Sequence, residues 1–492
     1  MGSYILSIDQ STQGTKCLLF DAAGHMVRRM DRPHRQIIND LGWVEHDPME
    51  IYHNLYGIVK DLLSACGIAG HDLAAVGISN QRETALAWNR ETGAPVYHAI
   101  VWQCARGAAI CEALRQQGVA AQIQEHTGLP LSPYFSAAKL AWILQNVPEA
   151  GVLMREGKLA MGTMDSWLLY KLTGHCCTDV SNASRTQLFN IHELRWDTEI
   201  CEMFGIRPEA LAQVRDSDGE YGVTDFNGLF DVPVPVRAVF GDSHAALFGQ
   251  GCHEPGMIKA TYGTGSSVMM HIGAEPIPSH KGLVTSLAWS LDGQASYVLE
   301  GNINYTGASI AWLQKDLQLV ADAGSTAAMA QQAHPQDRSY FVPAFTGLGA
   351  PYWDSEATGL FTGITRVTGR NELVRAVLDS IAYQIQDITS LMQQESGQVV
   401  RALRVDGGPT RNSYLMQFQT DILDRPVEVP ETEELSAMGA AYGAGIAVGL
   451  YDRQQVFDQV RRRVYSCRMA AERRQELLAG WKAAVRRTLA RV

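Results

Sequence analysis

The first residues alternate between short apolar runs and polar turns. Residues 5–8 and 16–20 are mostly apolar, while residues 9–14 and 21–24 each begin with Asp and end with Gly. This alternation predicts antiparallel strands joined by tight turns, the start of a β-meander.

A long helix is predicted after Asp47, because Pro48 stands at a first helical position and apolar residues recur at helical spacing. Its apolar face comprises Ile51, Leu55, Ile58, Val59, Leu62 and Leu63. Further helices are predicted near residues 107–118, 137–146 and 165–173. Residues 236–240 predict a buried strand that ends abruptly at residues 241–242.

A similar succession of strands, turns and helices begins again after residue 250. The pattern predicts a strand over 257–261 leading into a Gly/Thr/Ser turn, a helix over 370–396, and a strand over 402–405 with a helix from about 411. A further helix from near Ser436 is rich in Gly and Ala, which favours close approach to a neighbouring element. We therefore expect two related halves that pack against each other over a cleft.

The C-terminal stretch differs in charge. From Tyr451 onward there are 11 Lys or Arg and 4 Asp or Glu, although the whole chain carries a formal charge of −11. Leu477, Leu478, Trp481, Ala484 and Val485 lie at helical spacing among the basic residues. A nucleic-acid or membrane-surface role is one interpretation of this stretch. The favoured interpretation is a docked helix whose basic face is solvated.

Length and composition narrow the class. A chain of 492 residues corresponds to about three domains of typical size, or to two large ones. The net acidic charge argues against nucleic acid as a partner. No apolar run reaches the length of a membrane span, and the first residues do not resemble a secretory signal. Nine scattered cysteines are typical of the reducing cytoplasm.

Candidate chemistry lies in the turns at strand ends. Residues 9–16 combine a carboxylate, hydroxyl groups, a glycine and a lysine in one predicted hairpin. Such a turn can bind phosphate oxygens while its carboxylate holds Mg²⁺ directly or through water. Residues 263–265 and 406–408 are two further Gly-containing turns. Three such turns in two halves predict a nucleotide between two domains, although neither a P-loop nor a GxGxxG fingerprint is present.

Two segments resemble the signatures of the FGGY carbohydrate kinases. Residues 134–146 resemble the first signature, and residues 359–364 with 371–384 resemble the second. Within that family the chain is most similar to the glycerol kinases, through residues 43–48, 80–84, 183–186 and 341–345. The resemblance extends from about residue 4 to about residue 450.

The resemblance implies an α/β fold of two actin-like, ribonuclease H-like ATPase domains flanking a cleft. We expect an N-terminal domain over 1–250, a C-terminal domain over 251–450 and a helical tail over 451–492. The implied cofactors are ATP and Mg²⁺, and the implied partner is a small polyol or sugar that receives the γ-phosphoryl group. A homodimer or homotetramer is also implied.

The resemblance also assigns roles to individual residues. Asp242 would be the catalytic carboxylate, and Asp9 with Asp242 would hold the metal ion. The phosphates would contact Thr12, Gln13, Lys16, Thr264 and Gly265, and the nucleoside pocket would include Gly307, Gly408 and Asn412. The acceptor would contact Arg82, Glu83, Trp102, Tyr134, Asp242, Ser243 and Ser267.

Each assignment has a structural alternative. Asp242 is also suited to cap a helix that starts at residue 243. Adjacent Arg82 and Glu83 are often a surface ion pair, aromatic residues are more often core than ligand wall, and glycines are often ordinary turns.

Two departures from the glycerol kinase pattern bear on the acceptor. Ser243 stands where Gln is usual after the catalytic Asp, and Ser267 stands where Phe is usual beyond the Gly-Thr-Gly turn. Both replace a bulky side chain by a small hydroxyl side chain, so the sequence predicts an acceptor larger than glycerol, such as a tetritol, pentitol or ketose. The alternatives are a true glycerol kinase and, in another class, an actin-like ATP-driven binding protein without an acceptor. A catalytically dead regulator or scaffold is disfavoured because Asp9, Thr12 and Asp242 are intact.

Overall fold

Strand β1 lies at the centre of the N-terminal sheet in the computed structural model, which describes residues 2–490. It pairs antiparallel with β2, which pairs antiparallel with β3, so the predicted meander is confirmed. On its other side β1 pairs in parallel with β6, and β6 pairs in parallel with β15. The strands in spatial order are β14 (Val223–Thr224), β15 (Val234–Gly241), β6 (Leu73–Asn80), β1 (Tyr4–Gln10), β2 (Gly14–Phe20) and β3 (Met26–Pro33).

The C-terminal sheet repeats this arrangement. Its strand β16 pairs antiparallel with β17 and in parallel with β22, as β1 does with β2 and β6. The predicted repetition of the plan after residue 250 is therefore confirmed. The strands in spatial order are β18 (Val284–Leu291), β19 (Gln294–Ile303), β17 (Ser266–Gly273), β16 (Ile258–Tyr262), β22 (Leu403–Asp406), β23 (Val427–Pro430) and β24 (Arg462–Tyr465).

The predicted helices form where the apolar spacing placed them. Helix α1 begins at Pro48, the carboxylate of Asp47 accepts a hydrogen bond from the Met49 N–H at 2.9 Å, and Gly67 ends the helix at a φ of 67°. The other predicted helices are α2 (Ala108–Gln116), α4 (Ser136–Asn146), α6 (Met164–Thr173), α12 (Arg370–Ser396), α13 (Ser413–Leu423) and α14 (Leu435–Ala447), with α1 spanning Pro48–Cys66.

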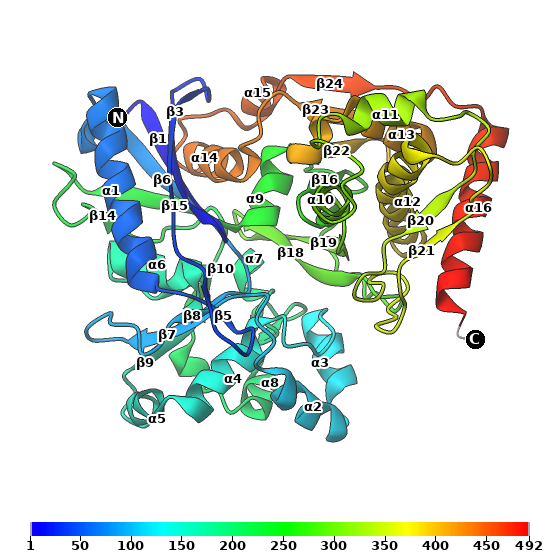
Figure 1. Cartoon of the computed structure of the whole chain (residues 1–492). Helices are drawn as coiled ribbons and strands as arrows, with labels where there is room; N and C mark the ends of the chain where they lie inside the picture. Colours follow the sequence, from blue (N-terminus) through cyan, green and yellow to red (C-terminus); the bar gives the residue numbers. More distant parts are fainter. Residues whose placement is uncertain (1, 491–492) are drawn as a thin grey trace.

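A separate five-stranded sheet lies below the N-terminal sheet in Figure 1 and carries its own hydrophobic core. Its strands are β4 (Ile37–Ile38), β5 (Val44–His46), β8 (Ala99–Ile100), β7 (Ala85–Asn89) and β9 (Leu159–Thr163), near helices α3 (Ala120–Thr127), α5 (Pro148–Arg155) and α8 (Thr198–Met203). The sequence pattern did not predict this sheet, because β4, β5 and β8 have only two or three residues and are too short to show an alternation.

Short elements connect these layers. Three further two-stranded pairings are β10 (Cys177–Asp179) with β13 (Gln213–Arg215), β11 (Phe189–Asn190) with β12 (Arg195–Trp196), and β20 (Tyr340–Val342) with β21 (Leu360–Thr362). The remaining α-helices are α7 (Val180–Ala183), α9 (Asp242–Gly249), α10 (Gly307–Lys315), α11 (Thr326–Gln332), α15 (Arg453–Asp458) and α16 (Ala471–Leu489). Short 3₁₀ turns cover 70–72, 208–210 and 408–411.

Helix α14 packs between the two sheets, against α9 and against strands β6, β1 and β15 (Figure 1). The contact is backbone against backbone: a Cβ on Gly439 would lie 1.9 Å from the carbonyl oxygen of Ala245, and one on Gly77 would lie 2.2 Å from that of Ala440. The hydroxyl of Ser7 also donates to the carbonyl of Ala437 at 2.7 Å. The expected close approach of this Gly/Ala-rich helix is therefore present.

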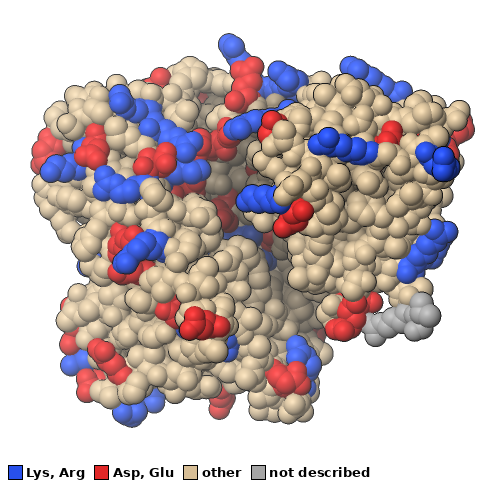
Figure 2. All heavy atoms as spheres, viewed as in Figure 1, with Lys and Arg blue, Asp and Glu red and all other residues tan. Residues whose placement is uncertain are grey.

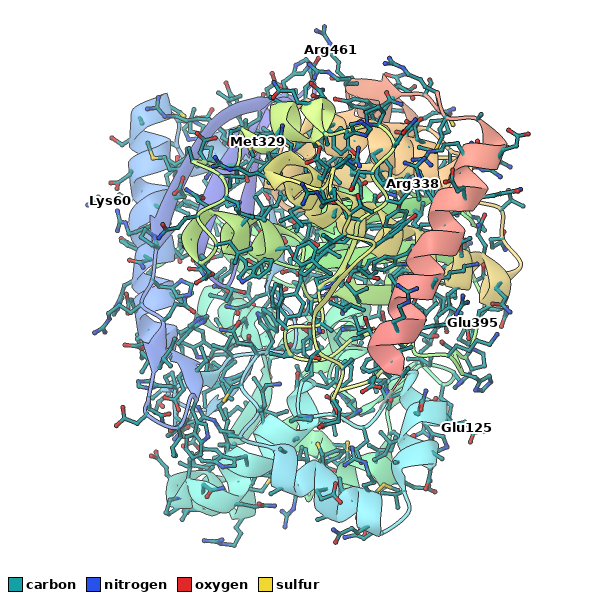
Figure 3. The ribbon with its side chains drawn as sticks, turned by 45° about the vertical axis from the view of Figure 1, so that its right-hand side comes forward. Lys60, Glu125, Met329, Arg338, Glu395 and Arg461 are labelled. Carbon is teal, nitrogen blue, oxygen red and sulfur yellow. The ribbon has the colours of Figure 1, made fainter. Side chains whose placement is uncertain are left out.

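The C-terminal helix α16 lies along the outer side of the C-terminal domain, where Figure 3 shows Arg338 beside it. Arg338 Nε donates to Glu476 of α16 at 3.0 Å. Trp481 is 1% exposed, stacks on Tyr383 with ring centroids 5.2 Å apart, and donates its indole N–H to Asp387 at 2.6 Å. The basic tail thus ends in a docked helix, as expected. Among residues 2–490, no helix is both long enough and apolar enough to span a membrane.

Truncation of the Trp481 anchor is expected to undock α16. Trp481→Ala removes a buried ring and its hydrogen bond, so it should lower the unfolding free energy of the C-terminal domain by about 3–5 kcal/mol. Thermal unfolding followed by tryptophan fluorescence and limited proteolysis at α16 measure this change. The exposed Arg486→Ala on the same helix is the matched control, and equal stability of the two variants would contradict the docking role.

Candidate active site

Three parallel strands of the N-terminal sheet end side by side. Asp9 of β1 pairs with Ser79 of β6, and Gly241 of β15 pairs with Asn80. Asp242 follows directly as the first residue of α9. Because the carboxyl ends of parallel strands meet at one edge of a sheet, the two predicted carboxylates are brought to the same edge. Figure 2 shows the surface hollowed between the two large domains, with acidic side chains inside the hollow.

Asp9 is buried, and its carboxylate accepts from the Ser79 hydroxyl at 3.0 Å. Burial raises the pKa of Asp9 from 3.8 to about 6 against the opposing charge of Lys16, and the negative charge of Asp242 adds to the rise. The two carboxylates therefore repel each other. A divalent cation between them would remove this repulsion, and one or two carboxylates plus phosphate oxygens and water are the usual ligands of Mg²⁺. Among residues 2–490, no group of three or more His, Cys, Asp or Glu side chains could hold a metal without such additional ligands.

The first hairpin turn is tied to its surroundings through two residues. Lys16 Nζ lies 2.9 Å from Glu434 and 3.7 Å from Asp9, so the predicted phosphate-binding cation already has two carboxylate neighbours. The Thr12 hydroxyl accepts from the indole N–H of Trp102 at 3.0 Å. Gln13 is exposed at the tip of the turn. The β1–β2 hairpin thus contacts the C-terminal domain through Lys16 of β2, and an aromatic residue predicted to bind the acceptor through Thr12 of the turn.

The turn between β16 and β17 forms the second predicted phosphate element. Its Gly263 N–H donates to the Gly265 carbonyl at 2.7 Å, and the Gly307 N–H donates to the Gly263 carbonyl at 2.9 Å. A Cβ on Gly265 would lie 2.3 Å from the Ile303 carbonyl, so only glycine fits there. The structure therefore brings Thr264, Gly265 and Gly307 together at one end of the C-terminal sheet.

Gly408 begins the 3₁₀ turn after β22, and Asn412 follows its last residue, beside β16. Thr261 of β16 pairs with Asp406, and a Cβ on Gly407 would lie 2.0 Å from the Tyr262 carbonyl. By contrast, a Cβ on Gly408 would meet nothing within 4 Å, so this glycine has open space for a ligand. Asn412 caps α13 by accepting from the Leu415 N–H at 3.0 Å. Its side chain therefore has a structural role besides the predicted nucleoside contact.

The predicted acceptor residues Arg82 and Glu83 are not a surface pair. Arg82 is 6% exposed and Glu83 is 2% exposed with a φ of 59°. The Arg82 side chain passes over Gly241, where a Cβ would lie 2.6 Å from its Cγ. Its Nε lies 3.3 Å from the carboxylate of Asp242, whose side chain is 34% exposed. Arg82 and Asp242 are therefore adjacent, which agrees with a shared role at the acceptor.

Trp102 and Tyr134 face each other edge to face, with ring centroids 5.6 Å apart. The backbone before Ser136 is fixed by Lys139, whose ammonium group is buried and donates to the carbonyls of Pro133 at 2.9 Å, of Phe135 at 3.0 Å and of Tyr134. Burial lowers the pKa of Lys139 to about 7. Lys139 thus orders the segment that carries Tyr134.

Three charged residues at the site were missed by the sequence reasoning. Glu300 of β19 accepts from Arg82, Arg185 donates its Nε–H to Glu83 at 2.6 Å, and Glu434 pairs with Lys16. Glu300 had a detectable signal, because a carboxylate between apolar residues of a buried strand requires a charged partner. Arg185 lay inside a segment used only for the family resemblance. Glu434 lies in a loop and gave no such signal.

Residues 4–249 match the N-terminal domain, and residues 258–448 the C-terminal domain, of the FGGY family of carbohydrate kinases. The chain belongs to this family, as the resemblance predicted. It is an ATP-dependent phosphotransferase that acts on a hydroxyl group of a carbohydrate or polyol. The rival class of ATP-driven binding proteins without an acceptor is therefore set aside.

Particular relatives match the whole chain. A glycerol kinase of Caldanaerobacter subterraneus subsp. tengcongensis is 45% identical, and glycerol kinase 2 of Thermotoga maritima is 46% identical, each over 99% of both chains. The structure of Plasmodium falciparum glycerol kinase with ADP superimposes with a TM-score of 0.94 at 34% identity, covering 99% of both chains. A xylulose kinase from Lactobacillus acidophilus, at 23% identity and a TM-score of 0.88, shares the fold.

The prediction of an acceptor larger than glycerol is wrong. Relatives with 44–46% identity over the whole chain are named glycerol kinase. The prediction treated Ser267 as free hydrogen-bonding capacity in an enlarged pocket. Instead, its hydroxyl donates to Glu300 at 2.9 Å, and the backbone N–H of Ser243 donates to the Asp242 carboxylate at 2.7 Å. The small side chain at 267 thus holds a buried carboxylate.

Asp242→Asn is expected to lower kcat by about 10²–10⁴-fold, because an amide cannot accept the hydroxyl proton. The affinity for a non-hydrolysable ATP analogue should remain close to that of the wild type, since this change leaves the second hairpin turn intact. Steady-state ADP release and calorimetric titration measure the two quantities. The control Asp231→Asn makes the same chemical change at an exposed position and should leave kcat and the affinity for the ATP analogue unchanged. A near-normal kcat for Asp242→Asn would show that Asp242 has no catalytic role.

Proposed function

We propose that this enzyme phosphorylates glycerol with ATP·Mg²⁺ as the phosphoryl donor. The observation that carries the proposal is the full-length similarity to glycerol kinases together with the adjacent Arg82 and Asp242 at the strand ends. A cation and a carboxylate at that distance present a donor and an acceptor to neighbouring hydroxyl groups, as a polyol requires.

The acceptor contacts come from one side of the cleft. Arg82 and Glu83 are rigidly held by buried partners, and Trp102 with Tyr134 supplies an apolar wall for the carbon chain. Burial and the negative charge of Glu83 raise the pKa of Tyr134, so its hydroxyl stays protonated and can donate a hydrogen bond. These groups favour a short polyol whose adjacent hydroxyls contact charged residues.

Asp9 and Asp242 would hold the metal ion, which when bound offsets the negative charge on the transferred phosphoryl group. Thr12 and Gln13 in the first turn, and Thr264 and Gly265 in the second, would contact the phosphates from opposite domains. Gly307, Gly408 and Asn412 would line the nucleoside. Lys16 would contact a phosphate from its place between Asp9 and Glu434.

Asp242 would accept the proton of the attacking hydroxyl. An aspartate is a weak base, so it mainly orients the hydroxyl and takes the proton late in the transfer. Arg82 fixes the direction of the Asp242 carboxylate through the 3.3 Å contact at Nε. Catalysis then consists mostly of alignment and charge stabilisation, since the transition state of phosphoryl transfer is loose.

Among polyols and ketoses of three to seven carbons, glycerol is expected to have the highest kcat/KM, by about tenfold or more. The expectation follows from the full-length similarity to glycerol kinases, and the hydroxyl of Ser267 is already bound to Glu300. A coupled assay of acceptor-dependent ADP release measures the panel, with Asp242→Asn as the background control. A four- or five-carbon acceptor that outperforms glycerol would refute the proposal.

A further inference from the structure

A chain of alternating charges, buried except at Asp242, crosses from one domain to the other at the proposed acceptor site. Its N-terminal members are Asp242, Arg82, Arg185 and Glu83, and its C-terminal member is Glu300 on β19. The side chain of Glu300 has no solvent exposure. A carboxylate is rarely buried to this degree unless its partners neutralise it.

Glu300 accepts hydrogen bonds from both terminal nitrogens of the Arg82 guanidinium. Nη1 donates to Oε2 at 2.9 Å and Nη2 donates to Oε1 at 3.0 Å, which is the bidentate geometry. Nη1 of Arg185 lies 3.1 Å from the same Oε2, and the Ser267 hydroxyl donates to Oε1 at 2.9 Å. Burial alone would raise the pKa of Glu300, but the two guanidinium groups hold it well below the ordinary range.

These hydrogen bonds determine which N–H donors of Arg82 remain available to a substrate. A guanidinium has five N–H donors. Two are bound by Glu300, and Nε lies 3.3 Å from the Asp242 carboxylate as an ion pair, so one N–H on each of Nη1 and Nη2 remains for the acceptor. Without Glu300 the Arg82 side chain would lose its anchor and could turn onto Asp242, occupying the carboxylate needed for the hydroxyl.

We infer that Glu300 is a positioning residue for the acceptor: it extends from the C-terminal domain and orients Arg82 of the N-terminal domain toward the acceptor and Asp242. The acceptor site is therefore complete only when the two domains adopt the arrangement seen here. This inference rests on the proposed function, because it assumes that Arg82 contacts the acceptor.

Glu300→Gln tests the inference with little change in shape. One amide cannot accept from both ends of Arg82, so the guanidinium should shift, and a displacement of about 1 Å costs on the order of 10²-fold in kcat/KM. We expect this loss to fall mainly on the KM for glycerol, with the affinity for an ATP analogue changed by less than about threefold. The matched control is Asp379→Asn, which also replaces a buried carboxylate of the C-terminal domain by an amide. Asp379 accepts a hydrogen bond from the Tyr414 hydroxyl, and its replacement should leave the KM for glycerol unchanged.

A double-mutant cycle distinguishes positioning from a general structural role. If Glu300 acts through Arg82, adding Glu300→Gln to Arg82→Lys should lower kcat/KM by less than about threefold further. Fully multiplicative effects, or a Glu300→Gln enzyme with unchanged KM for glycerol, would overturn the inference. So would an equal loss in the Asp379→Asn control.

Ser267→Ala covers the case in which Glu300→Gln does not fold. It removes one hydrogen bond to Glu300 and should raise the KM for glycerol by about threefold to tenfold, with the thermal midpoint nearly unchanged. An unchanged KM in this variant would also count against the inference. If the wild-type enzyme turns over no glycerol, the proposed function is refuted. The same variants would then be measured with the best acceptor of the polyol panel. An unchanged KM for that acceptor would overturn the inference about Glu300.

Discussion

The site depends on the backbone contact between α9 and α14. No side chain can intervene, because a Cβ on Gly439 would lie 1.9 Å from a carbonyl of α9 and one on Gly249 would lie 2.4 Å from the carbonyl of Leu435. Asp242 begins α9, and the Ser436 hydroxyl donates to its backbone carbonyl at 3.0 Å. The contact that joins the two sheets therefore also fixes the backbone of Asp242, the proposed catalytic residue.

The close packing of the two domains also explains the buried ion pairs between them. Close contact between domains buries ionisable groups, and a buried charge is tolerated only beside a partner. Glu300 with Arg82 and Glu434 with Lys16 are two such pairs, each joining a C-terminal carboxylate to an N-terminal cation. One pair lies at the proposed acceptor site and the other at the β1–β2 hairpin, which is the first proposed phosphate element. Separation of the domains would expose these charges to water or leave them without their partners. The electrostatic energy of the site therefore depends on the arrangement of the domains.

The sequence predicted most of the architecture, because the signals were local or repeated. Helix α1 was marked by Asp47, Pro48 and an apolar face. The first meander was marked by apolar runs between turns that begin with Asp and end with Gly, and the start of the second half by a strand leading into a Gly/Thr/Ser turn. The five-stranded sheet was not predictable, since its strands are short and pair across long stretches of chain. The site residues found in the sequence lay at strand ends or in family segments. Those that were missed, such as Arg185, act through partners distant in sequence.

Ser267 shows why the acceptor was predicted wrongly while the class of reaction was predicted correctly. A sequence gives the size of a side chain, but it does not show which neighbour uses the space or the hydroxyl. Replacement of a large residue by serine was therefore interpreted as added room for substrate. In the structure the serine hydroxyl is bound to Glu300, a residue 33 positions further along the chain. The specificity of such a pocket depends on the whole buried network of hydrogen bonds, because each buried donor or acceptor left without a partner costs about 1–3 kcal/mol.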